Sequence, residues 1–157
     1  MSTIKTSYGS GNQSITITLV SLANAAQRQS TALDNTSDLF LDALVFLKIK
    51  SAGSGPAAGS FANVYVYGTA DGGTTYSDGA TGTDGTITLT APPNMRLLGV
   101  INMPAVSTTY EAGPFSVAAV LGFLPQKWGI VVENLSGGAF DGTTAAAWYQ
   151  GVEATVA

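Results

Sequence analysis

The chain has 157 residues, of which 45% are apolar and only 10% are charged, and its net charge at pH 7 is −4. This size and apolar content fit one folded domain with its own core, and no apolar run approaches the ~20 residues of a membrane helix. The lack of cysteine and histidine excludes thiolate nucleophiles, disulfides and histidine-based triads, and the negative net charge leaves no basic face for nucleic acid.

The first predicted element is an extended N-terminal arm, residues 1–13, with Ile4 and Tyr8 as its apolar anchors. Residues 14–19 then alternate strictly between polar and apolar, which predicts a half-buried strand and the start of a single β-sandwich domain, 14–157. Residues 22–35 allow two interpretations. A short helix over 23–28 is one, but an extended return strand over 27–33 fits the surrounding β pattern better.

The strongest predicted strand covers residues 39–50. One face carries only apolar side chains: Leu39, Leu41, Ala43, Val45, Leu47 and Ile49. The opposite face places Leu44 and Phe46 among Phe40, Asp42, Lys48 and Lys50. Because apolar side chains are unexpected on a solvated face, this strand lies either between two packed layers, which we favour, or under a partner.

The remaining strands are predicted over residues 61–67, 86–90, 96–103, 115–123, 128–133 and 145–156, with Gly and Pro between them. Residues 69–85 form a long Gly-, Asp- and Thr-rich loop that we expect on the surface. Eight or nine strands without crossover helices predict an all-β fold, an antiparallel two-sheet sandwich of jelly-roll type. A closed barrel is the second choice.

No pattern of residues points to catalysis, a metal or a cofactor. Asp71, Asp78 and Asp84 share one loop and suggest a calcium site, but their spacing fails the EF-hand pattern and Asp-Gly pairs are ordinary turn chemistry. Glu133 and Asp141 complete a trio with Asp71 for glycoside hydrolysis, without the supporting residues of such a cleft. We therefore predict a protein that is not an enzyme and binds neither metal nor cofactor.

Aromatic residues are the remaining candidates for contacts. Trp128 and Trp148 are expected in the core, because large aromatics often fill sandwich interiors, whereas Tyr76 in the acidic loop is the better candidate for an exposed contact. An exposed Tyr or Trp binds sugars by stacking and also anchors protein interfaces.

Four features occur in an order that carries a resemblance: the turn Asp34-Asn35, the long strand 39–50, the loop start Tyr-Gly-Thr-Ala-Asp-Gly-Gly at 67–73, and Trp128-Gly129. In this order the chain resembles small virion structural proteins of tailed bacteriophages. The resemblance implies a β-sandwich that decorates or cements a capsid, or sits in the tail, within a virion assembled in the host cytoplasm. It implies no catalytic residues.

The implied partners are further copies of the chain, as a homotrimer, and the major capsid protein or other virion proteins, with no nucleic acid and no membrane. The arm and the outer face of strand 39–50 would supply the contacts. The predicted interface residues are Ile4, Tyr8, Leu44, Phe46 and Tyr76. The alternative is a carbohydrate-binding or tail-attachment module with a groove lined by Tyr76 and at least one Trp.

Overall fold

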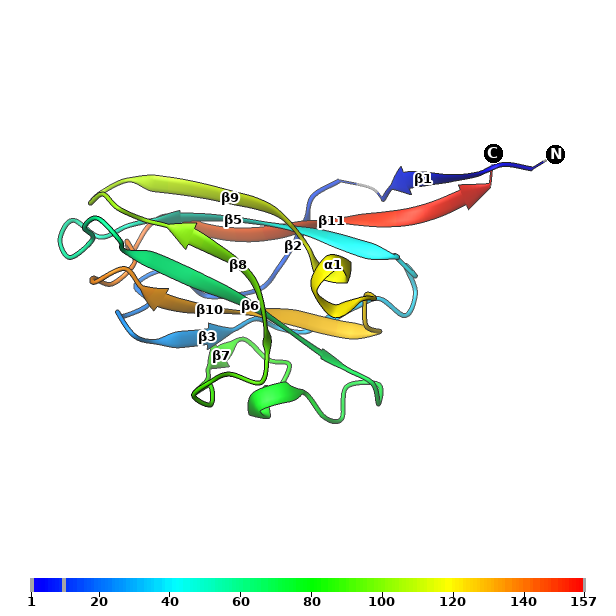
Figure 1. The fold of residues 1–157 in the computed structure, drawn as a ribbon, viewed down its shortest axis with the longest axis horizontal. Coiled ribbons are helices and arrows are strands. Elements are labelled where there is room, and N and C mark those ends of the chain that lie inside the picture. Colours follow the sequence, from blue (N-terminus) through cyan, green and yellow to red (C-terminus); the bar gives the residue numbers. More distant parts are fainter. Residues whose placement is uncertain (1, 10, 157) are drawn as a thin grey trace.

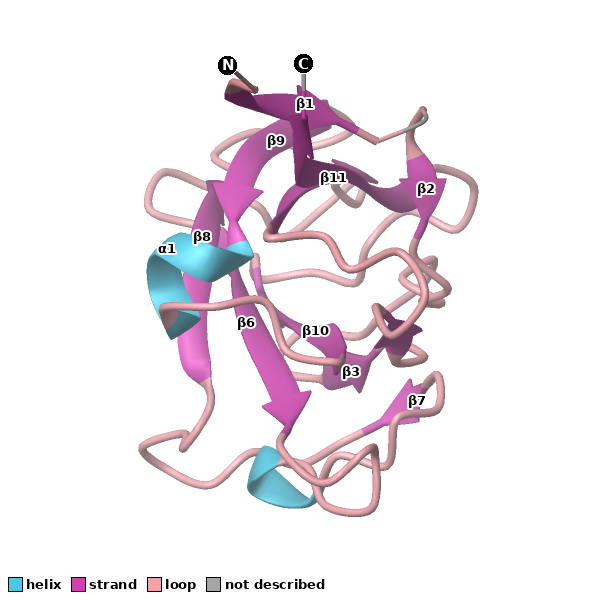
Figure 2. Ribbon diagram, turned by 90° about the vertical axis from the view of Figure 1, so that its right-hand side faces the viewer, coloured by secondary structure: helices cyan, strands magenta, loops and turns pink. Residues whose placement is uncertain are grey.

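The computed structural model describes residues 2–9 and 11–156, with 44% of the residues in strands and 5% in helices. Two antiparallel sheets pack face to face, with sheet A above sheet B in Figure 1 and the same sheets seen from the side in Figure 2. The predicted all-β, two-sheet antiparallel sandwich is therefore confirmed.

Sheet A has the order β1-β11-β5-β9, and β2 pairs with β11 beside β1. Its strands are β1 (Ile4–Tyr8), β2 (Gln13–Ser14), β5 (Asp42–Lys50), β9 (Thr109–Ser116) and β11 (Ala145–Val156). The last part of β11 extends beyond the body of the molecule together with β1, so the start of β1 and the end of β11 lie at the tip of a projection (Figure 1).

Sheet B has the order β7-β3-β10-β6-β8, and β4 pairs with β10. Its strands are β3 (Gln27–Gln29), β4 (Leu33–Asp34), β6 (Phe61–Thr69), β7 (Gly85–Thr86), β8 (Arg96–Asn102) and β10 (Lys127–Leu135). A short 3₁₀ helix, η1 (Ser77–Gly79), lies in the long loop after β6.

The strand pairs of the two sheets are nested along the chain. β2 pairs with β11, β3 with β10, β5 with β9 and β6 with β8, always antiparallel. Two further pairs, β5 with β11 and β6 with β10, join these ribbons into sheets. Successive pairs along the chain therefore alternate between sheet A and sheet B.

The core lies between the sheets and follows the alternation of the central strands. The inward side chains of β5 are fully buried, as are Val64 of β6 and Trp128 and Ile130 of β10. The Trp128 ring meets Tyr149 of β11 edge to face, with ring centroids 5.3 Å apart. The expectation of a core position is correct for Trp128 and wrong for Trp148, which lies partly exposed on the outer face of sheet A.

The predicted strand over residues 39–50 begins only at Asp42. Leu39 and Leu41, expected on the buried face, are 70% and 60% exposed, and Phe40, expected on the other face, is buried. The cause is a loop held by the Asn35 side chain, which accepts a hydrogen bond from the Phe40 N–H (2.9 Å) and donates one to the Phe40 carbonyl (3.0 Å). The favoured interpretation, a strand between two layers, is also wrong, because none of the described residues forms a layer over the outer face of β5 (Figure 1).

Other local predictions differ from the structure in instructive ways. Residues 14–19 leave sheet A after Ile15, whose N–H donates to the Ala147 carbonyl, because the Thr16 carbonyl accepts a hydrogen bond from the Thr31 N–H and the Thr18 N–H donates to Asp84. Likewise, residues 86–90 form a strand only at their start, in β7. The extended interpretation of residues 27–33 is confirmed in β3 and β4, with no helix there.

The predicted strand over residues 115–123 is mostly wrong. The chain instead forms β9 and then a one-turn helix, α1 (Val117–Leu121). The Ser116 hydroxyl accepts a hydrogen bond from the Ala119 N–H, and Gly122 ends the helix in the left-handed conformation. These caps override the apolar pattern of the segment.

Candidate interaction surface

Sheet A presents an outer face that no other layer formed by residues 2–9 and 11–156 covers (Figure 1). Leu44 and Phe46 of β5 point outward there and are half-buried, as the alternation of β5 dictates. Phe46 stacks on Trp148 of β11, with ring centroids 5.9 Å apart and an angle of 7° between the ring planes. The two strands bring this pair together because Trp148 lies directly opposite Phe46 in the ladder.

A hollow of about 350 Å³ opens beside this aromatic pair. It is lined by Asn12, Phe46, Leu47, Glu111, Ala112, Gly113 and Trp148. The charged residue among them, Glu111, forms an ion pair of 3.0 Å with Lys48. The hollow therefore presents aromatic surface and a carboxylate that already has a cation beside it.

The projection in Figure 1 is a two-stranded ribbon made by β1 and the last five described residues of β11. The register pairs Ile4 with Val156 and Tyr8 with Val152, so directly opposite residues share a face. One face of the ribbon thus carries apolar side chains with a single threonine: Ile4, Thr6, Tyr8, Val152, Ala154 and Val156. We call this set the ribbon face.

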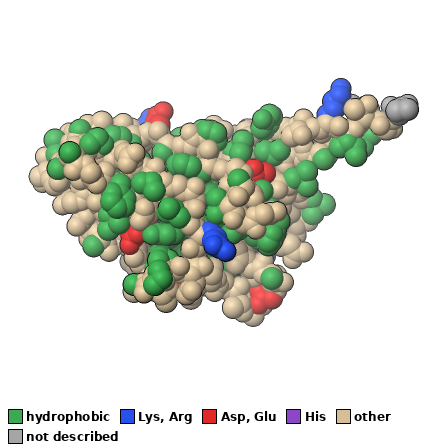
Figure 3. All heavy atoms as spheres, in the orientation of Figure 1, with side chains coloured by type: hydrophobic (Ala, Val, Ile, Leu, Met, Phe, Trp, Pro, Cys, Tyr) green, Lys and Arg blue, Asp and Glu red, His purple; other side chains and the backbone are tan. Residues whose placement is uncertain are grey.

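The ribbon face is exposed to solvent. Ile4 is 75% exposed, Tyr8 66% and Val156 74%. The opposite face of the ribbon is polar, with Lys5 and Thr155, and with Ser7 donating a hydrogen bond to Glu153 (3.0 Å). Figure 3 shows hydrophobic side chains gathered along one side of the projection.

The outer edge of β1 is free among the described residues, since β11 is the only strand paired with it. The Gly9 N–H donates to the Gly151 carbonyl, so by the alternation of an antiparallel ladder the backbone groups of Ile4, Thr6 and Tyr8 point away from β11. At the other edge of sheet A, β9 contains Gly113-Pro114 and a register shift opposite it. Proline and bulges are the usual protection of an edge strand, and β1 has neither.

The structure places four of the five predicted interface residues on sheet A. Ile4 and Tyr8 lie on the ribbon face, and Leu44 and Phe46 lie on the outer face of β5. The fifth, Tyr76, lies on the far side of the molecule, packed edge to face against Tyr67 of sheet B at 5.3 Å. Tyr76 belongs to a small apolar cluster that the segment between β6 and β8 forms over sheet B.

No groove joins Tyr76 to a tryptophan, as the carbohydrate-binding alternative required. Trp128 is buried in the core, and Trp148 lies on the outer face of the other sheet. The pairing of the end of β11 with β1 was not predicted. The sequence does carry a signal for it, because the apolar positions of residues 152–156 are out of phase with those of residues 145–151.

The candidate carboxylates are dispersed. Each aspartate of the long loop accepts hydrogen bonds from a different segment: Asp71 from Thr74 and Thr75, Asp78 from Asn94, and Asp84 from Arg28. Hydrogen bonds, above all from the Thr69 hydroxyl, hold the pKa of Asp71 below its usual value. Within residues 2–9 and 11–156, no three Asp or Glu side chains lie close enough together to hold a metal ion.

Glu133 and Asp141, the other members of the proposed acid trio, lie on different elements. Glu133 accepts hydrogen bonds from Gln27 (2.8 Å), Asn63 (3.0 Å) and Tyr65 (3.0 Å) on the outer side of sheet B. Burial raises the pKa of Glu133, but these three donors outweigh it and the net pKa is lowered. Asp141 instead pairs with Lys50 at 3.3 Å.

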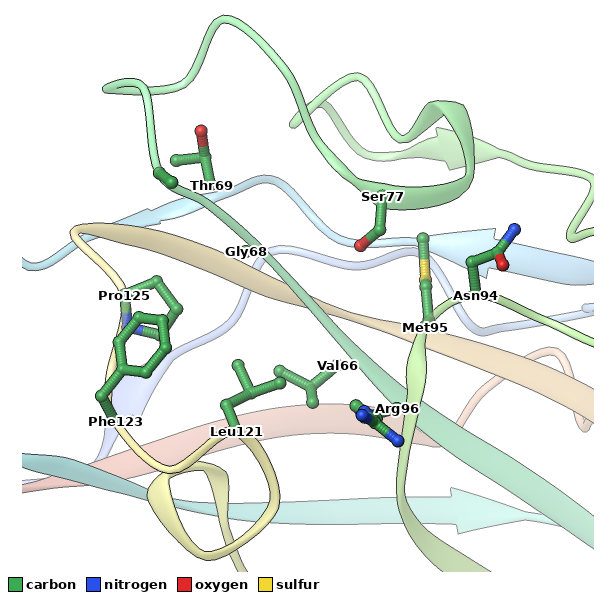
Figure 4. A pocket seen from close by; sticks show the side chains of 11 residues that line it. Val66, Gly68, Thr69, Ser77, Asn94, Met95, Arg96, Leu121, Phe123 and Pro125 are labelled. Atoms are coloured by element: carbon green, nitrogen blue, oxygen red, sulfur yellow. The ribbon is translucent and has the colours of Figure 1, made fainter.

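A second hollow, of about 300 Å³, lies between the end of β6 and the segment after α1 (Figure 4). Its walls combine apolar side chains such as Met95, Leu121 and Phe123 with Asn94 and Arg96. In Figure 4, Phe123 and Pro125 line one side, and Met95 and Arg96 the other. This hollow is not predictable from the sequence, because its residues come from segments far apart in the chain.

Comparisons of the chain with protein-family models, with curated proteins and with solved structures give no match. None of the helices in the described part of the chain has the length and apolar character needed to cross a membrane.

Proposed function

We propose that this chain is a structural protein of a tailed-bacteriophage virion, a decoration or cement protein that stabilises the capsid as an oligomer, with a trimer as the expected form. The observation that carries the proposal is the ribbon face. An apolar surface on a projection beyond the core contributes little to folding of the monomer, so its value lies in contact with another molecule.

The topology supports the same class of protein. Nested antiparallel pairing across two sheets is the arrangement of jelly rolls, which occur in viral capsid proteins and also in lectins and cupins. We therefore propose to class the sandwich as a jelly roll. Fold alone does not select one function, so the virion assignment rests on the resemblance of the sequence together with the ribbon.

The proposed mechanism is mechanical. Each copy contributes modest contacts to its neighbours and to the shell beneath, and a closed oligomer makes them simultaneously, so their effects multiply. The low content of charged side chains suits such dense contacts, because few charges must be desolvated when the surfaces meet.

The test uses phage particles produced from a genome that encodes the chain. Particles purified by density gradient should contain the 15.9 kDa chain by mass spectrometry. Particles lacking the gene should lose DNA at lower temperature, and added purified protein should restore their stability. If the chain does not copurify with intact particles, the proposal is wrong.

The Phe46–Trp148 pair beside its hollow favours one second candidate, a carbohydrate-binding or tail-attachment module. A partly exposed tryptophan next to a polar residue such as Asn12 is a suitable platform for a sugar ring. This candidate predicts hits on a glycan array and a change of tryptophan fluorescence on binding, which Trp148→Ala abolishes. An array without hits would remove it.

A further inference from the structure

We infer that the ribbon face of one copy docks on the outer face of sheet A in a second copy, with its apolar side chains in the hollow beside Phe46 and Trp148. The inference rests on the proposed function in one respect, that the chain works as an oligomer, and it names the interface that makes the oligomer.

The two surfaces are complementary in shape. The ribbon is a projection with large side chains on one face, and the hollow, with about 350 Å³, has room for a side chain of the size of Ile4 or Tyr8. The ribbon of a given copy points away from its own body (Figure 1), so another copy is needed to bring it over such a hollow.

The chemistry of the two surfaces also matches. The ribbon face has no charged side chain, and its one threonine lies opposite Ala154. The charged side chain that lines the hollow, Glu111, is already paired with Lys48. A charged ligand would therefore find no counterpart in either place, whereas two apolar surfaces gain by leaving water together.

The area is sufficient for a contact of this kind. The ribbon face offers on the order of 500 Å² of apolar surface, so docking removes about 1,000 Å² from water over both copies, the lower limit for a specific interface. A single contact of this size is weak. Because ribbon and hollow are different surfaces, copies can join head to tail, and a closed ring of three makes three such contacts.

The free edge of β1 gives a second means of attachment. The backbone N–H and C=O groups of Ile4, Thr6 and Tyr8 have no partner within the described chain and lie along the side of the docked ribbon. The N–H groups are positioned to donate hydrogen bonds to the second copy and the C=O groups to accept them, for example with the side-chain amide of Asn12 at the hollow.

Cross-linking tests the inference directly, because the chain has no cysteine and every cross-link reports only introduced thiols. Two single variants are mixed: Thr6→Cys on the ribbon face, and Asn12→Cys at the hollow with a tag that changes its size. The matched control replaces Thr6→Cys by Lys5→Cys, one residue away on the opposite face of the ribbon. A short bismaleimide then traps mixed dimers, which are separated by denaturing electrophoresis.

We expect at least tenfold more mixed dimer from Thr6→Cys than from Lys5→Cys, and loss of this excess when the Asn12→Cys partner also carries Trp148→Ala. Equal yields from the two ribbon variants would overturn the inference. If equal yields occur while the chain is still found in purified particles, the interface is wrong and the proposed function stands. If the chain is absent from particles but the excess is found, the proposed function is wrong and the interface stands.

Discussion

The two halves of β11 run in one strand but meet different surroundings. In residues 145–151 the odd positions, such as Ala147 and Tyr149, are buried in the core. In residues 152–156 the odd positions, Glu153 and Thr155, are polar, and the even positions carry the apolar side chains of the ribbon face. The pairing with β1 and β5 shows no register shift in β11, so the phase of the alternation changes while the backbone continues regularly.

The change of phase marks where sheet B ends. Phe40 closes the core there, with its ring over Gly9 and Gly151, and beyond it nothing lies beneath the ribbon. The ribbon therefore has no core to cover. Its apolar face is not required by the monomer, and this difference between body and ribbon is the physical basis of the interface.

The largest expected effect comes from truncating an apolar side chain in the body. Leu47→Ala should lower the free energy of unfolding by about 2–5 kcal/mol, because Leu47 is fully buried and its loss leaves a cavity. Ile4→Ala should change it by less than about 0.5 kcal/mol for the monomer, as for other exposed positions. Urea unfolding of dilute protein measures both. Equal losses would mean that the ribbon is part of the folding core.

The junction between the two regions should be sensitive to added bulk. A Cβ at position 151 would lie 2.5 Å from the Phe40 ring, so Gly151→Val should destabilise the protein by about 1–3 kcal/mol through overpacking. Thermal unfolding measures the effect, with Thr155→Val on the exposed ribbon as the control. A neutral Gly151→Val would show that Phe40 does not close the core.

Two glutamates extend the comparison to polar groups. Glu133→Gln should lower the free energy of unfolding by about 1–2 kcal/mol, because an amide in place of the carboxylate faces three donors. Glu153→Gln in the ribbon should change the free energy of unfolding by less than about 0.5 kcal/mol. Since the folded pKa of Glu133 is lowered, its stabilising contribution is present above the unfolded pKa of about 4.3 and is lost as pH falls further.

Urea titrations between pH 3 and pH 7 check this sign. The difference in stability between the wild type and Glu133→Gln should shrink as the solution becomes more acidic. A difference that grows on acidification would contradict the assignment of Glu133 as an ionised acceptor.

The smallest effect on folding should follow removal of residues 2–8, which include the strand β1. The midpoint of thermal unfolding should shift by only a few degrees, because these side chains contribute almost nothing to the core. The oligomer, in contrast, should be lost. A shortened chain that unfolds far earlier than the wild type would assign β1 a structural role instead.

The regular strands were predictable because their alternation is set by burial on one face. This applies to β5 and to the first part of β11, where every second position is buried, whereas the middles of β6 and β10 are buried on both faces. Prediction failed where a side chain bonded to the backbone competes with alternation. Asn35 holds Phe40 out of the strand and into the core, and the cap at Ser116 turns an apolar segment into α1.

Of the candidate surface, the sequence identified the residues but not their arrangement. Leu44 and Phe46 stood out because apolar side chains break the polar face of a strand. The partner of the N-terminal arm was missed, since pairing between residues 150 positions apart leaves no local pattern. Tyr76 was misjudged because its loop folds back over Tyr67, a contact that composition cannot reveal.

The native mass of the purified protein by light scattering on a sizing column tests the central claim most directly. We expect a native mass near three times 15.9 kDa for the wild type. A variant with Ile4→Asp and Tyr8→Asp on the ribbon face should have the mass of one chain. A wild type that stays at the mass of one chain at high protein concentration, or a variant that keeps the mass of the wild type, would contradict this claim.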